Sequence, residues 1–549
     1  MVKSLESKIS VLITFLIQIT YFLIQSKWDP DPHHDGYVYA QALAASEGMV
    51  PNRDFFAMYG PLNPFLQGIW LNITNHNLIS LRYFASLLLA LTGVAIFVGT
   101  KNEIGRKYSF LLSLSWAIGN PLIHSPSLPW PNIILTLLLV SSIIIAKSDF
   151  KKFKYTFIYI GIILSLSILI RNYAIFSVLI LFVTMYYWPN KNVKALRHLT
   201  YGSLIAFLFV LVVFMKFKMT KSFVDQTIVY GFLKGHDSRD LRGLFNIRVL
   251  AFGIIFMAFL LIYQKIINSI RDSRKEIVKV SLFILITLTF AYSGHLQNNR
   301  NWNKGFSKNL IADCRLIMEN LINLPLYVIS FIFILVSISI LQLRKKSEDS
   351  IDLAAYAIAL SSIFQLFPSP HISKIWHIIP ILLVGLAPYF NLYFGQNINF
   401  LRTAINYIII PILISLLLVF YNQASVIRIP FKNDVLTGIL GKPDQVESID
   451  STMILLKTKG KARDIEFRCV DGLFATSGNK YLAVDPYYVI AIPPFAHEHF
   501  SASQIFFCHV SKPYNQIFDS SQYNIVFETK STYSNKFNLL IEKKLLNDN

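Results

Sequence analysis

The sequence predicts an α-helical polytopic membrane protein with about 13 transmembrane helices and a small C-terminal extracytoplasmic mixed α/β domain. Three observations lead to this fold class: an apolar composition, a series of long apolar runs, and a polar C-terminal tail. Of the 549 residues, 54% are hydrophobic and only 15% are charged, whereas a soluble chain has about 25% charged residues. The chain therefore lacks the polar surface that several soluble domains of this total length need.

A helix that crosses a bilayer needs about 20 mostly apolar residues. Thirteen runs approach this length, and the third, fourth and ninth of them are short. They lie near 9–26, 79–99, 108–121, 131–146, 155–170, 173–188, 200–216, 248–268, 279–293, 322–343, 351–367, 375–394 and 402–421. We expect residues 1–421 to form the transmembrane domain and 422–549 the C-terminal domain.

The formal net charge is +20, and the basic residues form short clusters between the apolar runs. Clusters of Lys and Arg follow every second run, and such clusters mark cytoplasmic loops. Thirteen spans then place the N-terminus in the cytoplasm and the C-terminal domain outside, in a multi-pass protein of the bacterial inner (plasma) membrane. Membrane topology accounts for the charge, so we expect membrane lipids and no nucleic acid as partners.

The first outer loop, residues 27–78, concentrates groups that can perform chemistry; we call it the acidic loop. It opens with Asp29, Asp31, His33, His34 and Asp35 directly after the first apolar run. A short helix is expected over residues 37–44 and a second short apolar stretch up to residue 70. Loops carry function disproportionately often, and we expect this one to fold back onto the membrane surface as one or two interfacial helices.

The acidic loop resembles the first outer loop of the GT-C membrane glycosyltransferases. The resemblance rests on an acidic residue that opens a short helix, a small-residue turn, and an Arg-Asp-aromatic segment that ends in Tyr-Gly-Pro-Leu at 59–62. It covers about 28–70 and is closest to bacterial relatives of the aminoarabinose and protein-mannosyl transferases. Asp35 is the matching acid and Asp54 the candidate second one. Many relatives have Asp-Glu where this chain has Asp35-Gly36, and no position clearly matches their second carboxylate.

The resemblance implies a glycosyltransferase that moves a sugar from a polyprenyl-phosphate-linked donor to a glycan, lipid or protein acceptor of the cell envelope, on the outer face of the membrane. A carrier flippase, a transporter or a polysaccharide polymerase of the same pathway is the alternative. Nucleotide hydrolysis is not expected, because the sequence has no Gly-x-x-x-x-Gly-Lys-Ser/Thr motif.

Each candidate acid also has a structural interpretation. Asp35 can act as a general base or cap the helix that follows it, and Asp54 can react or pair with its neighbour Arg53. A divalent ion, magnesium or manganese, could bind Asp35 and His34, because hard cations suit a phosphate substrate. We expect His34, Arg53 and Tyr59 to contact the substrate.

Cations for the donor phosphate are expected at the outer ends of the spans. Arg171 interrupts two apolar runs, and a charge at that depth is a candidate for function, although an arginine there can also reach the headgroups. The second candidate group lies in the Pro-rich loop at 367–377 and consists of His371, Lys374 and His377. This loop either binds phosphate or acceptor, or only begins the next helix.

The C-terminal tail has alternating apolar and polar residues, as in 523–528 and 487–492, which predict strands. It contains Cys469 and Cys508, which an oxidising compartment would allow to form a disulfide. Two cysteines carry no spacing pattern, so the pairing stays open. Cys314 would remain unpaired.

Overall fold

The computed structural model describes most of the N-terminal half of the chain and parts of the C-terminal half. The described residues are 2–31, 34–57, 59–119, 129–147, 155–187, 193–229, 350–366, 372–394, 424–458, 465–468, 505–510, 523–530 and 537–543.

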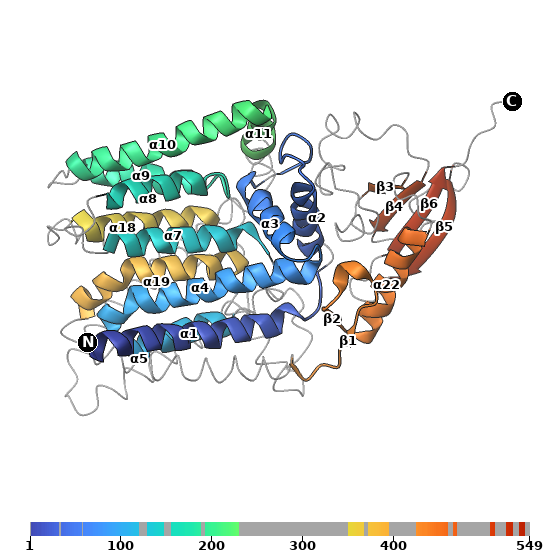
Figure 1. The fold of residues 1–549 in the computed structure, drawn as a ribbon, viewed down its shortest axis with the longest axis horizontal. Coiled ribbons are helices and arrows are strands. Elements are labelled where there is room, and N and C mark those ends of the chain that lie inside the picture. The colour runs from blue at the N-terminus through green and yellow to red at the C-terminus, as the bar shows by residue number, and fades with distance from the viewer. Residues whose placement is uncertain are drawn as a thin grey trace, which may run out of the picture.

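Aligned helices form a bundle that makes up the larger part of the described chain (Figure 1). Its helices are α1 (Val2–Ser26), α4 (Leu78–Ile104), α5 (Arg106–Ile118), α7 (Pro131–Lys147), α8 (Thr156–Ser167), α9 (Ala174–Tyr187), α10 (Val193–Phe217), α18 (Ser350–Ser361) with the 3-10 turn η2 (Ser362–Leu366), and α19 (Ile372–Phe394). Nine predicted apolar runs coincide with these helices. The runs at 248–268, 279–293, 322–343 and 402–421 lie outside the described residues, so the count of thirteen spans stays a prediction.

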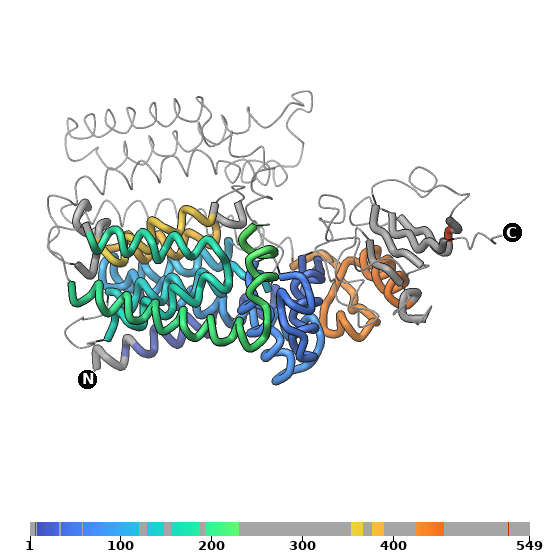
Figure 2. Tube along the Cα trace, turned by 90° about the horizontal axis from the view of Figure 1, so that it is seen from above, coloured from blue at the N-terminus to red at the C-terminus, as the bar shows by residue number. Residues whose placement is uncertain are grey.

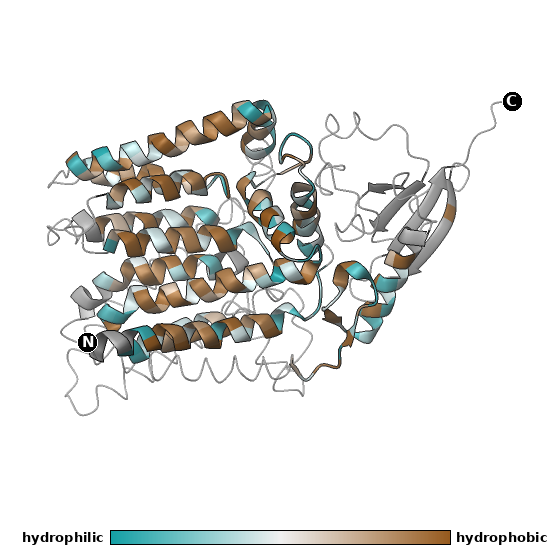
Figure 3. Ribbon diagram, viewed as in Figure 1, coloured by the Kyte–Doolittle hydropathy of each residue, from teal (hydrophilic) through white to brown (hydrophobic). Residues whose placement is uncertain are grey.

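Three helices of the described chain are long and apolar enough to cross a membrane: Lys8–Ser26 within α1, α4, and α10. Hydrophobic residues predominate along the helices of the bundle (Figure 3). On α10, for example, Phe207, Phe209, Val212 and Met215 are all more than 60% exposed. Surface of this kind is unfavourable in water and favourable in lipid, which agrees with the predicted membrane protein.

The interior of the bundle is built from close helix contacts. Leu135, Leu139 and Ile143 of α7 are fully buried in the largest apolar cluster. The contact between α8 and α10 depends on small residues, because a Cβ atom on Gly161 or Gly202 would overlap backbone atoms of the opposite helix. Small residues that let two backbones approach are typical of helices packed in membranes.

Two short helices lie across one end of the bundle, opposite the N-terminus: α2 (His34–Ser46) and α3 (Leu62–Ile73) (Figure 1). They correspond to the two short helical stretches predicted in the acidic loop. α2 does not lie as an amphipathic helix on a surface, because every residue from 35 to 44 is buried. Protein encloses it: α3 packs on it, and residues 424–458 share a core with it.

The C-terminal region contributes two described parts. Residues 424–458 contain β1 (Ile429–Pro430), the 3-10 turn η5 (Asp434–Leu436), β2 (Leu440–Gly441) and α22 (Pro443–Thr458), with β1 antiparallel to β2. A four-stranded sheet of β3 (Ile465–Arg468), β4 (Ile505–Val510), β5 (Tyr523–Lys530) and β6 (Phe537–Lys543) has the order β3-β4-β6-β5, parallel only between β3 and β4. The strand predicted at 523–528 lies in β5, whereas 487–492, Cys314 and Cys469 lie outside the described residues.

Seen from above, residues 424–458 follow α2 and α3 along the long axis of the molecule (Figure 2). One apolar cluster joins the two parts: Phe431, Ile439 and Ile449 are buried with Val38 and Leu81. The acidic loop and the beginning of the C-terminal region therefore pack as one unit. A domain boundary at 421/422 stays a prediction.

Candidate functional site

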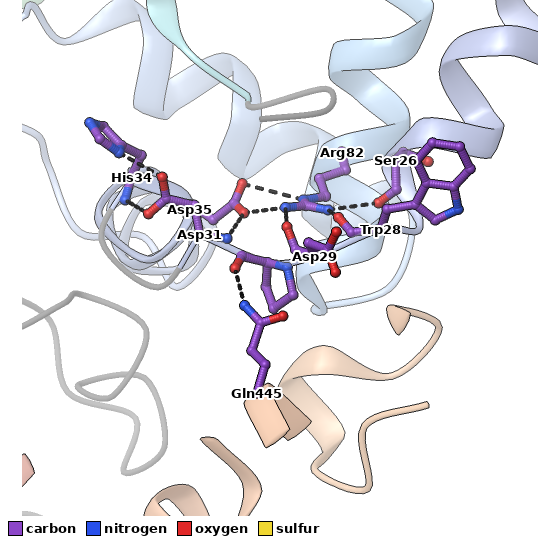
Figure 4. Close-up of polar contacts among 9 residues, drawn as sticks. Ser26, Trp28, Asp29, Asp31, His34, Asp35, Arg82 and Gln445 are labelled. Atoms are coloured by element: carbon purple, nitrogen blue, oxygen red, sulfur yellow. Dashed lines mark hydrogen bonds and ion pairs between the residues drawn. The ribbon is translucent and has the colours of Figure 1, made fainter. Parts of the chain in front are cut away.

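Asp35 lies at the start of α2 and is bound to Arg82 of α4 (Figure 4). Both side chains have 0% exposure, and the guanidinium contacts both carboxylate oxygens, Nη2 to Oδ2 in a short ion pair and Nε to Oδ1 at 3.3 Å. The backbone N–H of Asp31 also donates to Oδ2, at 2.8 Å. The acid that the family resemblance selects is thus enclosed by protein groups.

Arg82 was not among the residues predicted to matter. It also donates to the carbonyl oxygens of Ser26, Trp28 and Asp29, at 2.9, 2.7 and 3.1 Å. These carbonyls follow α1 directly, so one side chain of α4 fixes the chain that leaves the first helix. The sequence held a signal for it, because Arg82 is a charge inside the apolar run 79–99, and such a charge is a candidate for a special role.

Asp31 and His34 form the exposed polar pair of the loop. The Asp31 carboxylate accepts the backbone N–H of His34 at 2.9 Å, and its other oxygen lies 2.8 Å from the His34 Nδ1. Asp35 returns the contact by accepting the N–H of Asp31, which makes a reciprocal cap at the start of α2. Asp35 lies inside α2 and not before it, so Asp31, which accepts the His34 N–H, takes the capping place that the sequence interpretation gave to Asp35.

Burial raises the pKa of the Asp35 carboxyl above its ordinary value. The charge and hydrogen bonds of Arg82 act in the opposite direction, and the nearby Asp31 adds to the rise. The cause is the cost of removing a carboxylate from water, which a buried ion pair offsets only when its geometry is good. Arg82 is the group that offsets this cost here.

The expected metal site does not fit this geometry. Both oxygens of Asp35 already bind N–H donors, and Arg82 brings a positive charge to the place where a cation would lie. Within the described part of the chain, no three His, Cys, Asp or Glu side chains are placed to hold one metal ion. His33, the neighbour of His34, lies outside the described residues.

Arg171 lies against aromatic side chains at the same end of the bundle. It is 4% exposed, and its Cζ lies 3.9 Å from the centre of the Tyr59 ring. Tyr59 meets Trp130 edge to face at 5.2 Å, and Trp130 meets His34 at 5.4 Å. The structure thus links Arg171, Tyr59 and His34, three predicted site residues, through Trp130. Trp130 directly precedes α7, and nothing in its local sequence distinguishes it.

The position of Arg171 follows from the turn between α8 and α9. Its backbone N–H donates to the Ser167 carbonyl at 3.0 Å, and the N–H of Leu62 in the acidic loop donates to the Leu169 carbonyl at 3.1 Å. Gly60 has φ +128°, and a Cβ atom there would overlap the Leu169 carbonyl. Only glycine allows the loop to lie this close to the turn, and the contact brings Tyr59 over the guanidinium.

Arg53 and Asp54 pair with each other at the edge of the loop, as one of the two interpretations of Asp54 predicts. The guanidinium donates twice to the Asp54 carboxylate, at 2.7 Å each, and the N–H of Val50 donates to Asp54 Oδ2 at 2.7 Å. The side chains are 42% and 31% exposed. The hydrogen bond from Arg53 lowers the pKa of the Asp54 carboxyl.

A separate set of contacts docks this edge on the residues after α10, which are α11 (Thr220–Phe223) and the π-helical turn η1 (Val224–Val229). Gln226 accepts the Asn52 side-chain N–H and the Ala57 backbone N–H, at 3.0 and 3.1 Å, and donates to the Asn52 carbonyl. The residues after α10 thus help to fix the acidic loop.

The Pro-rich loop gives fewer observations. His371 lies outside the described residues, and Lys374 lies in α19, where only its backbone is described. His377 is buried in the bundle, its carbonyl accepts the Thr136 hydroxyl of α7 at 3.1 Å, and its ring meets Trp376 edge to face.

No protein-family model matches the chain, and no curated protein matches it. Two similar solved structures are archaeal. The crystal structure of the Archaeoglobus fulgidus oligosaccharyltransferase in complex with Zn and sulfate is 10% identical, covers 91% of this chain and 68% of its own, and has a TM-score of 0.49. The structure of the oligosaccharyltransferase AglB from Archaeoglobus fulgidus, in complex with an inhibitory peptide and a dolichol-phosphate, is 10% identical, covers 92% and 70%, and has a TM-score of 0.48. Both are oligosaccharyltransferases, and the closer likeness to aminoarabinose and protein-mannosyl transferases stays a prediction from the sequence.

Proposed function

We propose that this protein is an integral-membrane glycosyltransferase that moves a sugar from a polyprenyl-phosphate-linked donor to a cell-envelope acceptor. The observation that carries the proposal is Arg171, a cation 4% exposed whose Nε has no hydrogen-bond partner among the described residues. A buried charge without a charged partner is costly. An arginine that is buried without a charged partner among the described residues is suited to bind an anionic ligand.

The place of Arg171 favours a phosphate that is attached to a lipid. Arg171 joins the ends of α8 and α9, two apolar helices, and lies beside the acidic loop that covers this end of the bundle. A polyprenyl chain needs an apolar surface, and its phosphate needs a cation where that surface ends. The junction of bundle and loop offers both.

The residues next to Arg171 suit a sugar. Tyr59 and Trp130 are partly exposed aromatic rings in contact with each other, and the polar pair of Asp31 and His34 borders Trp130. Aromatic rings with an apolar body and a polar edge suit a ligand that is apolar on one face and wet on the other. We place the sugar against these rings and the acceptor toward the acidic loop.

The proposed reaction forms a bond between the acceptor oxygen and the anomeric carbon and breaks the bond from that carbon to the phosphate oxygen. The electron pair leaves on the phosphate, where the charge of Arg171 stabilises it. The acceptor proton passes to a basic group of the acidic loop. Asp35 is not assigned a metal ligand's part in this reaction, because both of its oxygens already accept N–H donors.

The test is transfer of radiolabelled sugar from polyprenyl-phosphate-linked donors, in membranes with wild type or Arg171→Gln at matched expression. We expect Arg171→Gln to lower transfer by about 10²–10³-fold with little change in melting temperature. The matched control is Arg106→Gln, which removes an exposed cation from a surface pair with Glu6 at the other end of α4. Equal transfer by wild type and Arg171→Gln would contradict the phosphate role, and labelled lipid that crosses the membrane without transfer would favour a flippase or transporter.

A further inference from the structure

We propose that Asp35 is a positioning residue that does not itself contact the substrate. Asp35 and Arg82 together fix the chain that leaves α1, and Arg428 holds the same chain through Asp29. The inference rests on the function proposed above, because it states which acid of the acidic loop is not the reacting one. It differs from the expectation that the family resemblance gave for Asp35.

The first step is the state of the carboxylate. Asp35 has 0% exposure, Arg82 binds both of its oxygens, and the N–H of Asp31 binds one of them again. A general base must come within hydrogen-bond reach of the acceptor hydroxyl. Asp35 could do so only if the buried ion pair opened and left Arg82 without its acid.

The second step is what Arg82 does with its remaining donors. A guanidinium carries five N–H groups, and those not used for Asp35 bind three backbone carbonyls just after α1. Carbonyls at the end of a helix carry partial negative charge and attract a cation. Arg82 therefore closes the end of α1, and Asp35 supplies the negative charge that makes a buried guanidinium tolerable.

The third step is the contact from the C-terminal region. Arg428 donates to the Asp29 carboxylate at 3.1, 3.1 and 2.7 Å and lies 4.9 Å from the centre of the Trp28 ring. The backbone of Leu440 pairs with the same turn, accepting the N–H of Asp29 at 2.8 Å and donating to the Lys27 carbonyl at 2.7 Å. Asp29 has φ +37°, an unfavourable conformation for a residue other than glycine. Two arginines therefore hold this turn: Arg82 binds the carbonyl of Asp29, and Arg428 binds its carboxylate.

Figure 4 shows the contacts side by side: Arg82 on one side of the turn, and Gln445 of α22 donating to the Pro30 carbonyl on the other, at 3.1 Å. α2 begins a few residues later and carries His34 against Trp130 and Tyr37 against Tyr59. A shift of the turn would move both contacts. The pairs thus position the face of α2 that borders the proposed sugar site.

The experiment is a double-mutant cycle on the full chain in detergent, with melting temperature as the readout. The variants are Asp35→Asn, Arg82→Gln and both together, and the control cycle uses the exposed pair of Glu6 and Arg106. We expect each buried single variant to melt well below wild type and the double variant to fall by less than the sum, while the control cycle stays near wild type and additive. If Asp35 were the reacting acid, Asp35→Asn would instead have the melting temperature of wild type.

A second arm measures transfer. If Asp35 is a positioning residue, the double variant Asp35→Asn/Arg82→Gln should have a higher KM for the donor and a kcat within about tenfold of wild type. Loss of a catalytic base would instead lower kcat by about 10²–10⁴-fold. A kcat loss in that range at an unchanged melting temperature would overturn the proposal. If wild type transfers no sugar, the proposed function fails, and the melting cycle still tests the positioning pair.

A third arm tests the link to the C-terminal region. Arg428→Ala should increase amide hydrogen exchange across residues 29–46, and Lys432→Ala, which removes an exposed cation of the same segment, should not. Equal exchange in the two variants would overturn the part assigned to Arg428. The readout needs no substrate, so it stays informative if transfer is not observed.

Discussion

Two aspartates of the acidic loop form Asp–Arg pairs that are alike in chemistry and opposite in surroundings. Asp35 and Arg82 are fully buried and 47 residues apart, whereas Arg53 and Asp54 are neighbours in sequence and remain 42% and 31% exposed. Water screens the exposed pair, so its attraction is weak. The buried pair has no water to replace a lost partner, so removing one member leaves an uncompensated charge. Both acids are paired with an arginine, so it is burial that makes the fold depend more on Asp35 than on Asp54.

The largest effect is expected from Asp35→Asn. It leaves Arg82 buried without its counter-charge, and breaking a buried pair in this way costs about 3–5 kcal/mol. Chemical denaturation of the purified protein would measure the loss. If the free energy of unfolding of Asp35→Asn equalled that of wild type, the proposed difference between the buried and the exposed pair would be contradicted.

An intermediate effect is expected from Arg428→Lys, because the Asp29–Arg428 pair is partly buried, at 29% and 6% exposure. Lysine keeps the charge but not the forked hydrogen bonds or the stacking on Trp28. Losing hydrogen bonds to a charged group costs about 1.5–3 kcal/mol. The same denaturation measurement applies, and Arg428→Ala should be less stable than Arg428→Lys.

The smallest effect is expected from Asp54→Asn, with a fall in melting temperature of no more than about a third of that for Asp35→Asn. The hydrogen bond from Arg53 lowers the pKa of Asp54 in the folded protein. The stabilisation by the charge is therefore present above the ordinary aspartate pKa and is lost as the pH falls through the lowered one. Melting curves of wild type and Asp54→Asn should converge in acid, and a gap that widens there would contradict this sign.

Local sequence patterns were enough for the described helices. Long apolar runs predicted nine of them, and the charge between two runs made Arg171 a candidate residue, because both signals depend on neighbouring residues. Arg82 stands out locally as a charge inside an apolar run, but its partner Asp35 does not follow from that pattern. Trp130 and Arg428 have partners far along the chain, which no local pattern encodes. The burial of α2 was not expected for the same reason, because it packs on residues 424–458 far along the chain. The position of the acidic loop at the membrane surface stays a prediction.

The ion pair of Asp29 and Arg428 joins residues 399 positions apart, which bears on the order in which the protein can mature. At about 5–20 residues per second of synthesis, Arg428 is made roughly 20–80 s after Asp29. During that interval Arg82, which is made soon after the turn, can already bind its carbonyls, whereas Arg428 cannot yet bind Asp29. The acidic loop can therefore reach its final form only late in biogenesis, after most of the membrane-embedded chain exists.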